Sequence, residues 1–321
     1  MTLPPFPQTV IAVIWDFDKT LLPGYMQDPL FNRYGVDGNT FWKEVQGLAR
    51  HYRDQGNYRV SEDTIYLSHI LSYVREGVFD GLTNEVLKEL GSELKFYPGV
   101  PEIFSALEAR VTGNERFARH EISVEHYIVS TGLRQIIVGS AVNEHVEGVW
   151  ACEFVESVAE PGYLTKQTKL EADSGVISEI AYAIDNTTKT RAVFEINKGV
   201  NKHDEISVND SMDDEARRVP FKNMLYIADG PSDVPVFSVL NRFGGETFGV
   251  YKAESEPEFR QITSLSREGR VQGCGPADYT VDSHTGRSLS YAVDRIATAI
   301  SERRERALGD SIGKSPGHIL E

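Results

Sequence analysis

Cysteine is nearly absent from this sequence of 321 residues, which contains only Cys152 and Cys274. The two are far apart and form no C-x-x-C pair, so the sequence indicates neither a disulfide framework nor a zinc site. Long hydrophobic runs are also missing, because no apolar stretch approaches the roughly 18 residues needed to span a bilayer. The first residues lack the basic flank of a signal peptide. We therefore expect a cytoplasmic protein that does not enter a membrane.

Basic residues are few relative to acidic ones. The chain has 33 lysines and arginines against 48 aspartates and glutamates, which gives a formal net charge of −15. Such a charge repels nucleic acids and anionic membrane surfaces. No H-E-x-x-H motif is present, and no G-x-S-x-G, P-loop or G-x-G-x-x-G follows a predicted strand. We expect a small-molecule partner and no nucleic acid or membrane, and the oligomeric state stays open.

Several apolar runs separated by helical patterns predict the fold class. The predicted strands are residues 10–15, 126–129, 224–228, 248–251 and, more weakly, 279–281. The run over 10–15 has no polar alternation, which is typical of a central strand covered on both faces. Strands that alternate with helices form parallel sheets. The sequence therefore predicts an α/β fold with a Rossmann-like, mainly parallel sheet flanked by helices.

One long segment departs from this alternation. Residues 23–96 contain amphipathic helical patterns and no convincing strand, which predicts a small helical cap domain inserted after the first strand. The α/β core domain would then comprise residues 1–22 and 97–302. Residues 303–321 are polar and interrupted by glycine and proline, so we expect a flexible tail there. Residues 203–218, rich in Asp, Asn and Ser, predict a solvated loop.

The first candidate site directly follows the first strand, in the run Asp16-Phe17-Asp18-Lys19-Thr20. Residues i and i+2 of an extended chain point to the same side, so Asp16 and Asp18 project together. They do so from the carboxyl end of the strand, where open α/β sheets bind ligands. Two converging carboxylates repel each other and favour a cation. A bare Asp-rich turn is the competing interpretation of such a short pattern.

A second acidic turn supports the interpretation of the first as a cation site. Asp229 and Asp233 occur in the run Ala228-Asp229-Gly230-Pro231-Ser232-Asp233, immediately after the apolar strand 224–228. If the two strands are neighbours, Asp16, Asp18, Asp229 and Asp233 together supply the oxygen ligands that Mg²⁺ prefers.

Two further sites have groups suited to an anion. Ser130-Thr131-Gly132 lies between a strand and a predicted helix over 133–138, where a hydroxyl and free N–H groups suit a phosphate. An ordinary helix cap explains the same residues. Lys189 falls in the first turn of another predicted helix, where a cation is disfavoured unless an anion binds. A solvated lysine is the alternative, and Lys198 and Lys202 compete for the same role.

Taken in chain order, these four sites resemble the four motifs of the haloacid dehalogenase (HAD) superfamily. The motifs are Asp16-Phe17-Asp18-Lys19-Thr20, Ser130-Thr131-Gly132, Lys189 and Asp229-Gly230-Pro231-Ser232-Asp233. The helical insertion also matches, because many members carry a cap between their first and second motifs. The arrangement is similar to the phosphoserine-phosphatase-like branch, although the cap sequence characteristic of phosphoserine recognition is missing. Lys19 departs from the small residue often found at its position.

The resemblance implies a Mg²⁺-dependent phosphatase, that is, a phosphoric monoester hydrolase acting through an aspartyl-phosphate. Asp16 would be the nucleophile and Asp18 the general acid and base. The resemblance assigns the metal site to Asp16, Asp18, Asp229 and Asp233, with Asp233 acting through water or by orienting Lys189. Ser130, Thr131, Gly132 and Lys189 would bind the phosphoryl group. Asp18 also argues against dehalogenation, because the dehalogenases of the superfamily lack that acid.

Two other functions fit the same fold. A phosphotransferase or phosphomutase would use the same residues but deliver the phosphoryl group to an alcohol. A non-catalytic protein that binds a phosphorylated ligand is a different class, and the intact set of aspartates argues against it. The leading hypothesis is hydrolysis of a small-molecule phosphate ester, because a cap of some 70 residues hinders large substrates.

Overall fold

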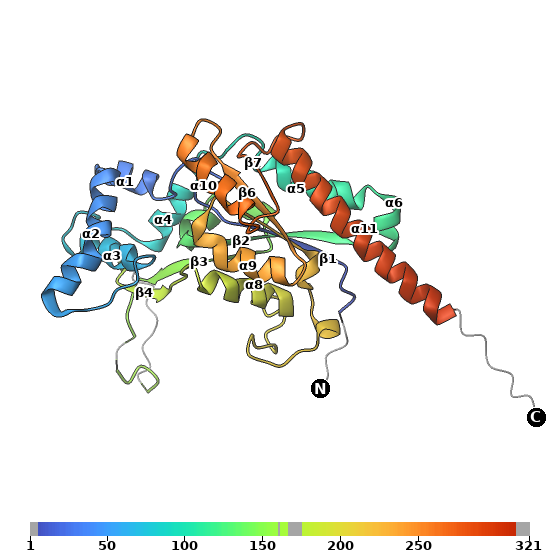
Figure 1. Ribbon diagram of the computed structural model, residues 1–321. Coiled ribbons are helices and arrows are strands. Elements are labelled where there is room, and N and C mark those ends of the chain that lie inside the picture. The colour runs from blue at the N-terminus through green and yellow to red at the C-terminus, as the bar shows by residue number, and fades with distance from the viewer. Residues whose placement is uncertain (1–5, 160, 166–174, 313–321) are drawn as a thin grey trace, which may run out of the picture.

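The computed structural model describes residues 6–159, 161–165 and 175–312 of the chain. Its centre is a seven-stranded sheet with the order β4-β3-β2-β1-β5-β6-β7 (Figure 1). Neighbouring strands are parallel except β3 and β4, which are antiparallel. The strands are β1 (Val10–Trp15), β2 (Ser123–Leu133), β3 (Gly148–Val155), β4 (Glu179–Tyr182), β5 (Met224–Ala228), β6 (Glu246–Tyr251) and β7 (Gly273–Pro276). The predicted α/β fold class is confirmed.

Helices cover both faces of this sheet, which explains why β1 is apolar throughout. Alternate side chains of a strand point to opposite faces. Ile11, Val13 and Trp15 accordingly join one hydrophobic core, and Ala12 and Ile14 join the other. The first core includes α5 (Glu102–Thr112) and α11 (His284–Ile312), and the second includes α8 (Thr188–Lys198), α9 (Val234–Arg242) and α10 (Glu256–Arg267). Shorter elements are α6 (Glu115–Arg119), α7 (Arg134–Val138) and the 3₁₀ turns η1 (Asn143–His145), η2 (Asp214–Ala216), η3 (Phe221–Asn223) and η4 (Pro231–Asp233).

The segment between β1 and the return to the sheet is helical. It contains α1 (Asp28–Tyr34), α2 (Gly38–Gly56), α3 (Ile65–Arg75) and α4 (Asn84–Gly91), and Figure 1 shows α1, α2 and α3 at one end of the molecule. Close contact joins this segment to the sheet domain, because a Cβ on Gly139 would lie 1.8 Å from the Lys88 carbonyl oxygen. Glycine at this position therefore lets α4 pack directly on α7.

The last strand was predicted at the wrong place. Residues 279–281 lie in the irregular segment between β7 and α11, and β7 is instead Gly273–Pro276. Tyr279 is buried for a different reason: it attaches this segment to the loops after β1 and before α5. Its N–H donates to the Pro98 carbonyl at 2.7 Å and its hydroxyl to the Thr20 carbonyl at 2.6 Å. Strand β7 has little β-propensity of its own and is formed by pairing with β6.

The expected flexible tail was also placed too early. Helix α11 continues to Ile312, and residues 313–321 lie outside the described residues. Its polar end is held by side chains from distant parts of the chain: Arg303 donates to Asn223 Oδ1 at 2.7 Å, and Glu305 pairs with Arg116 at 2.9 Å. Over the described ranges, no helix combines the length and the apolarity needed to cross a membrane.

A buried histidine in β2, beside β1, makes the stability of the fold depend on pH. His126 accepts a hydrogen bond from Trp15 Nε1 at 3.2 Å and lies 3.1 Å from the Phe104 carbonyl. Burial, with a smaller contribution from the charge of His145, lowers the pKa of His126 from 6.5 to about 3, although the hydrogen bond to the Phe104 carbonyl opposes the shift. The unfolded chain therefore binds one more proton than the folded protein between these values. We expect the free energy of unfolding to fall as pH drops through this window, by about 1.4 kcal/mol per pH unit from this group.

The measurement is urea unfolding from pH 7 to 4 for the wild type and His126→Gln. Glutamine can accept from Trp15 and donate to Phe104 without titrating. In a plot of unfolding free energy against pH, we expect the slope of the variant to be shallower than that of the wild type by the equivalent of one bound proton. Equal slopes for the two proteins would contradict the assignment.

Candidate functional site

The sheet order brings the two acidic turns together. Asp16 follows β1 and Asp229 follows β5, and these strands are neighbours with Trp15 opposite Ile227. The Asp16 N–H donates to the Ile227 carbonyl at 2.9 Å, which fixes the end of β1 against β5. As a result, one carboxylate oxygen from each of Asp16, Asp229 and Asp233 lies within 4.8 Å of the others.

Lys189 lies at the centre of this cluster. Its Nζ donates to Asp16 Oδ1 and to Asp233 Oδ1, both at 2.7 Å, and the lysine is 1% exposed. Asp185 fixes the start of α8 by accepting from the N–H groups of Thr187 and Thr188 at 2.9 and 2.7 Å. Burial alone would lower the pKa of Lys189, but the Asp16 and Asp233 carboxylates outweigh it and raise that pKa. The lysine is therefore a fixed positive charge.

Asp233 is held by three donors. Besides Lys189, the Tyr226 hydroxyl donates to Asp233 Oδ1 at 2.6 Å and the Ser232 hydroxyl donates to Oδ2 at 2.7 Å. Both oxygens of this fully buried carboxylate thus have partners. These contacts favour Asp233 as the group that orients Lys189, which is one of the two roles considered from the sequence.

The site holds three carboxylates and one lysine, and the pKa values of Asp16 and Asp229 are raised. Burial raises the pKa of Asp16 to about 6, with Lys189 opposing the shift and Asp233 adding to it. Burial, followed by the charges of Asp16 and Asp233, raises the pKa of Asp229 well above its usual range. A hard divalent cation such as Mg²⁺ fits this set of oxygen donors, because it would relieve the excess negative charge.

Asp18 occupies a different environment from Asp16. Its Oδ1 accepts the Met26 N–H at 2.8 Å. Burial raises the pKa of Asp18 to about 8, with a further contribution from the charge of Asp16. At neutral pH the side chain therefore carries a proton, whereas the nearby Asp16 is mainly ionised. Two carboxyl groups with separated pKa values are typical of an acid and nucleophile pair.

Ser130 and Gly132 lie at the end of β2, just before α7 begins at Arg134, but the N–H groups of Gly132 and Leu133 have partners and are not free as predicted. Strand β2 continues to Leu133, and α7 is only five residues long. The Ser130 hydroxyl accepts the Gly132 N–H at 3.0 Å, and the Leu133 N–H donates to Met26 Sδ at 3.0 Å. A Cβ on Gly132 would lie 2.0 Å from Met26 Cε, so a larger residue would require the Met26 side chain to move. Ser130 still lies at the same sheet edge as Asp16, because Ile128 pairs with Trp15.

The competing lysines lie elsewhere. Lys198 Nζ donates to the carbonyls of Val208 and Asp210 at 2.6 and 2.5 Å, and Lys202 pairs with Glu147. The polar segment 203–218 is thus tied to α8 through backbone carbonyls. It is also anchored at its end by the partly buried ion pair of Arg218 with Glu125.

Sequence reasoning missed three residues that contact the site. Thr20 donates its hydroxyl to Asp16 Oδ2 at 3.1 Å, and its place in the first motif could have indicated this. Met26 binds both Asp18 and Leu133 through its N–H and sulfur. Tyr226 gave no signal, because a tyrosine in the middle of an apolar strand is usually part of the core.

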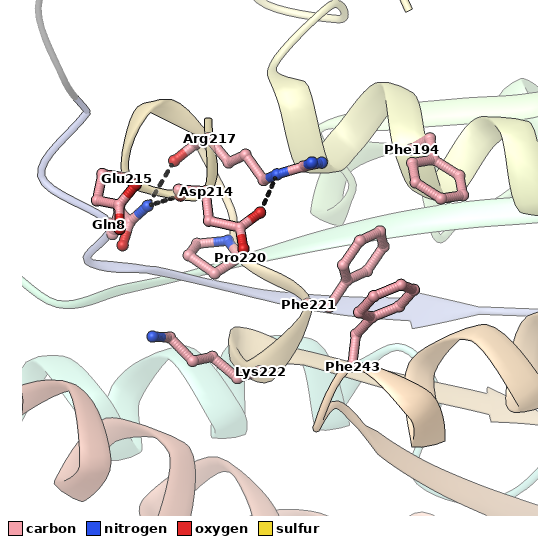
Figure 2. A pocket seen from close by; sticks show the side chains of 9 residues that line it. All are labelled: Gln8, Phe194, Asp214, Glu215, Arg217, Pro220, Phe221, Lys222 and Phe243. Carbon is pink, nitrogen blue, oxygen red and sulfur yellow. Dashed lines mark hydrogen bonds and ion pairs between the residues drawn. The ribbon is translucent and has the colours of Figure 1, made fainter. Parts of the chain in front are cut away.

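A cavity of about 230 Å³ lies away from this cluster (Figure 2). Apart from Phe194 of α8, its residues precede β1, β5 and β6, at the amino ends of these strands. Asp16 and Asp229 instead follow the carboxyl ends of β1 and β5. Phe221 stacks on Phe243 at 5.1 Å, and Gln8 donates to the carbonyls of Asp214 and Arg217. The cavity belongs to the opposite edge of the sheet and is not part of the carboxylate site.

Two solved structures share this fold. A HAD-family hydrolase from Salmonella enterica serovar Typhi matches with a TM-score of 0.51 and 12% identity over 84% of this chain and 68% of that chain. A probable phosphoserine phosphatase from Vibrio cholerae matches with a TM-score of 0.50 and 11% identity over 93% of this chain and 68% of that one. The protein therefore has the phosphoserine-phosphatase-like fold of the HAD superfamily, as the order of its motifs predicted.

Sequence comparison shows the family to which the chain belongs. It belongs to the same family as a Borreliella burgdorferi protein described only as uncharacterized, to which it is 40% identical over 276 residues, or 85% of this chain and 93% of that protein. No known family profile matches the chain.

Proposed function

We propose that the protein is a Mg²⁺-dependent phosphatase that hydrolyses a small-molecule phosphate monoester through an aspartyl-phosphate on Asp16. The observation that carries this proposal is the contact of Asp16 with Lys189 at 2.7 Å beside the carboxylates of Asp229 and Asp233. A carboxylate that is 5% exposed, ionised and held by a lysine is a fixed nucleophile. The phosphatase-type neighbours of the fold support the same reaction class.

Asp16 and Asp18 divide the chemistry between them. An Asp16 oxygen forms a bond to phosphorus, the bond to the leaving oxygen breaks, and Asp18 donates its proton to that oxygen. Water then attacks the aspartyl-phosphate and gives a proton to Asp18, which releases inorganic phosphate and restores Asp16. Asp18 is suited to the first step because its raised pKa keeps it protonated at neutral pH.

The remaining residues would bind the phosphoryl group and position it against Asp16. Lys189 and the Ser130 hydroxyl would hold the phosphoryl oxygens, and Asp233 keeps Lys189 directed at Asp16. Mg²⁺ held by Asp16, Asp229 and the Asp18 backbone carbonyl would offset the repulsion between carboxylate and phosphate. Helices α1 to α4 would admit small esters to the site and exclude large substrates.

The test is phosphate release from a broad panel of phosphate esters, with and without Mg²⁺, by the wild type and Asp16→Asn. We expect Mg²⁺-dependent release that the substitution abolishes, while folding is retained because asparagine has nearly the same shape. Transfer to an added alcohol that exceeds release to water would favour a phosphotransferase. No release or transfer from any ester by folded, Mg²⁺-binding wild type would overturn the proposal.

A further inference from the structure

An aromatic wall connects the segment after β1, which contains Asp18, to the end of β2. The wall consists of Tyr25, Trp42 and Tyr66, whose rings follow one another at 5.2 and 5.7 Å. At one end Tyr25 lies 4.8 Å from Lys19 Nζ and precedes Met26, which binds Asp18. At the other end the Tyr66 hydroxyl donates to the Thr131 carbonyl at 2.7 Å. A leaving group protonated by Asp18 would therefore meet this wall.

Three buried polar atoms without partners belong to the wall or to segments that contact the first motif and the residues after it. Among the described residues, Trp42 Nε1, Gln27 Oε1 and the Tyr97 hydroxyl are buried and have no hydrogen-bond partner. Gln27 and Tyr97 are only 2% and 9% exposed. Gln27 follows Met26 directly, and the Tyr97 N–H donates to the Leu21 carbonyl at 2.9 Å in the loop after the first motif. A buried polar group without a hydrogen-bond partner is destabilising, so a ligand that pairs with these groups would be favoured.

The helices of residues 23–96 bring no buried positive charge to the wall. Every arginine and lysine of residues 23–96 is exposed: Arg33, Lys43, Arg50, Arg53, Arg59, Arg75, Lys88 and Lys95. Arg33 pairs with Glu89 at 3.1 Å, and Arg134, just after the second motif, pairs with Glu153 at 3.5 Å. Lys19 lies outside these helices, with its Nζ 4.8 Å from the centre of the Tyr25 ring. A carboxylate or second phosphate on the leaving group would find no buried cation in these helices.

We infer that the substrate is the phosphate ester of a neutral polyhydroxylated compound, a sugar or another polyol. This inference rests on the proposed phosphatase function and adds the substrate class. The C–H faces of such a leaving group would lie against Tyr25, Trp42 and Tyr66, and its hydroxyls would pair with Trp42 Nε1, Gln27 Oε1 and Tyr97. A site built to bind hydroxyl groups discriminates strongly against analogues that lack them, because its own polar groups then stay unpaired.

The first experiment measures binding without chemistry. Asp16→Asn is titrated with glucose 6-phosphate, phosphoserine, phenyl phosphate and inorganic phosphate by calorimetry in Mg²⁺ buffer. We expect glucose 6-phosphate to bind at least tenfold more tightly than the other three. Tighter binding of phosphoserine or phenyl phosphate, or equal binding of all four, would overturn the inference.

The second experiment tests the indole N–H. Trp42→Phe keeps an aromatic ring and removes the donor, so KM for glucose 6-phosphate should rise on the order of tenfold while KM for phenyl phosphate stays the same. Trp150→Phe is the matched control, because Trp150 Nε1 already donates to Glu195 at 2.7 Å. Equal effects of Trp42→Phe on both esters would contradict a role in hydroxyl recognition.

The two arms separate the inference from the proposed function. If no ester releases phosphate but glucose 6-phosphate binds selectively and Trp42→Phe weakens that binding, the ligand class stands and the catalytic proposal fails. If phosphate is released but sugar phosphates are not preferred, the catalytic proposal stands and the inference fails.

Discussion

Replacing Lys189 with methionine is expected to lower kcat by about a thousandfold and to destabilise the protein by about 3–5 kcal/mol at pH 7. The activity loss follows from removing the donor that balances the Asp16 carboxylate and the phosphoryl oxygens. The stability loss follows because Lys189 Nζ bonds two carboxylates at 2.7 Å in a buried site. Methionine fills a similar volume and leaves both charges unpaired. Phosphate release in Mg²⁺ buffer measures the first effect, and urea unfolding in metal-free buffer measures the second.

The destabilisation has a pH signature. Without the lysine, the pKa of the Asp16 carboxyl rises further above the about 6 that burial already produces. A carboxyl with a raised pKa in the folded state binds protons that the unfolded chain releases, so the folded variant is stabilised as pH falls. The difference in unfolding free energy between the wild type and Lys189→Met should therefore shrink between pH 7 and 5.

Lys198→Met is the matched control for this prediction. Lys198 lies in the same helix and is also buried, but it donates to the Val208 and Asp210 carbonyls, which do not titrate. We expect it to lower stability by an amount that does not change with pH and to leave kcat within a fewfold. A pH-independent loss in Lys189→Met, or equal activity loss in both variants, would show that Lys189 acts only structurally.

The sequence defined the two central strands and the acidic turns because both depend on local patterns. Unbroken apolar runs ending in Asp16 and Asp229 require burial on both faces and an exposed carboxyl end. The sequence could not show that these two strands are neighbours, since strand order depends on pairing between residues far apart in the chain. The structure supplies that pairing, with Trp15 opposite Ile227.

Other features depend on tertiary contacts and left little trace in the sequence. Strand β7 contains two glycines and a proline, and it exists because β6 pairs with it. The role of Tyr226 depends on a hydroxyl meeting Asp233 seven residues later, after the chain has turned. The end of α11 is helical because Arg303 and Glu305 find partners near β5 and in α6. In each case the deciding partner is distant in sequence or lies across a turn.

Asp18→Asn is expected to separate the two halves of the reaction. Its effect should depend on the leaving group, because an alkoxide needs a proton to depart and a nitrophenolate does not. With an alkyl phosphate, we expect the rate to fall by about 10²–10⁴-fold without an early burst. With p-nitrophenyl phosphate, Asp16 can still be phosphorylated, but asparagine cannot take the proton of the attacking water. One nitrophenolate per enzyme should therefore appear rapidly, followed by slow turnover.

Rapid-mixing kinetics and intact-protein mass spectrometry measure this directly. The burst should coincide with a mass increase of one phosphoryl group, and the doubly substituted Asp16→Asn, Asp18→Asn protein should show neither. The raised pKa of Asp18, about 8, carries the argument for the acid role, since a carboxyl that is protonated at neutral pH can serve the first step before its base form serves the second. A variant that loses both esters equally and shows no burst would place Asp18 in the metal site alone.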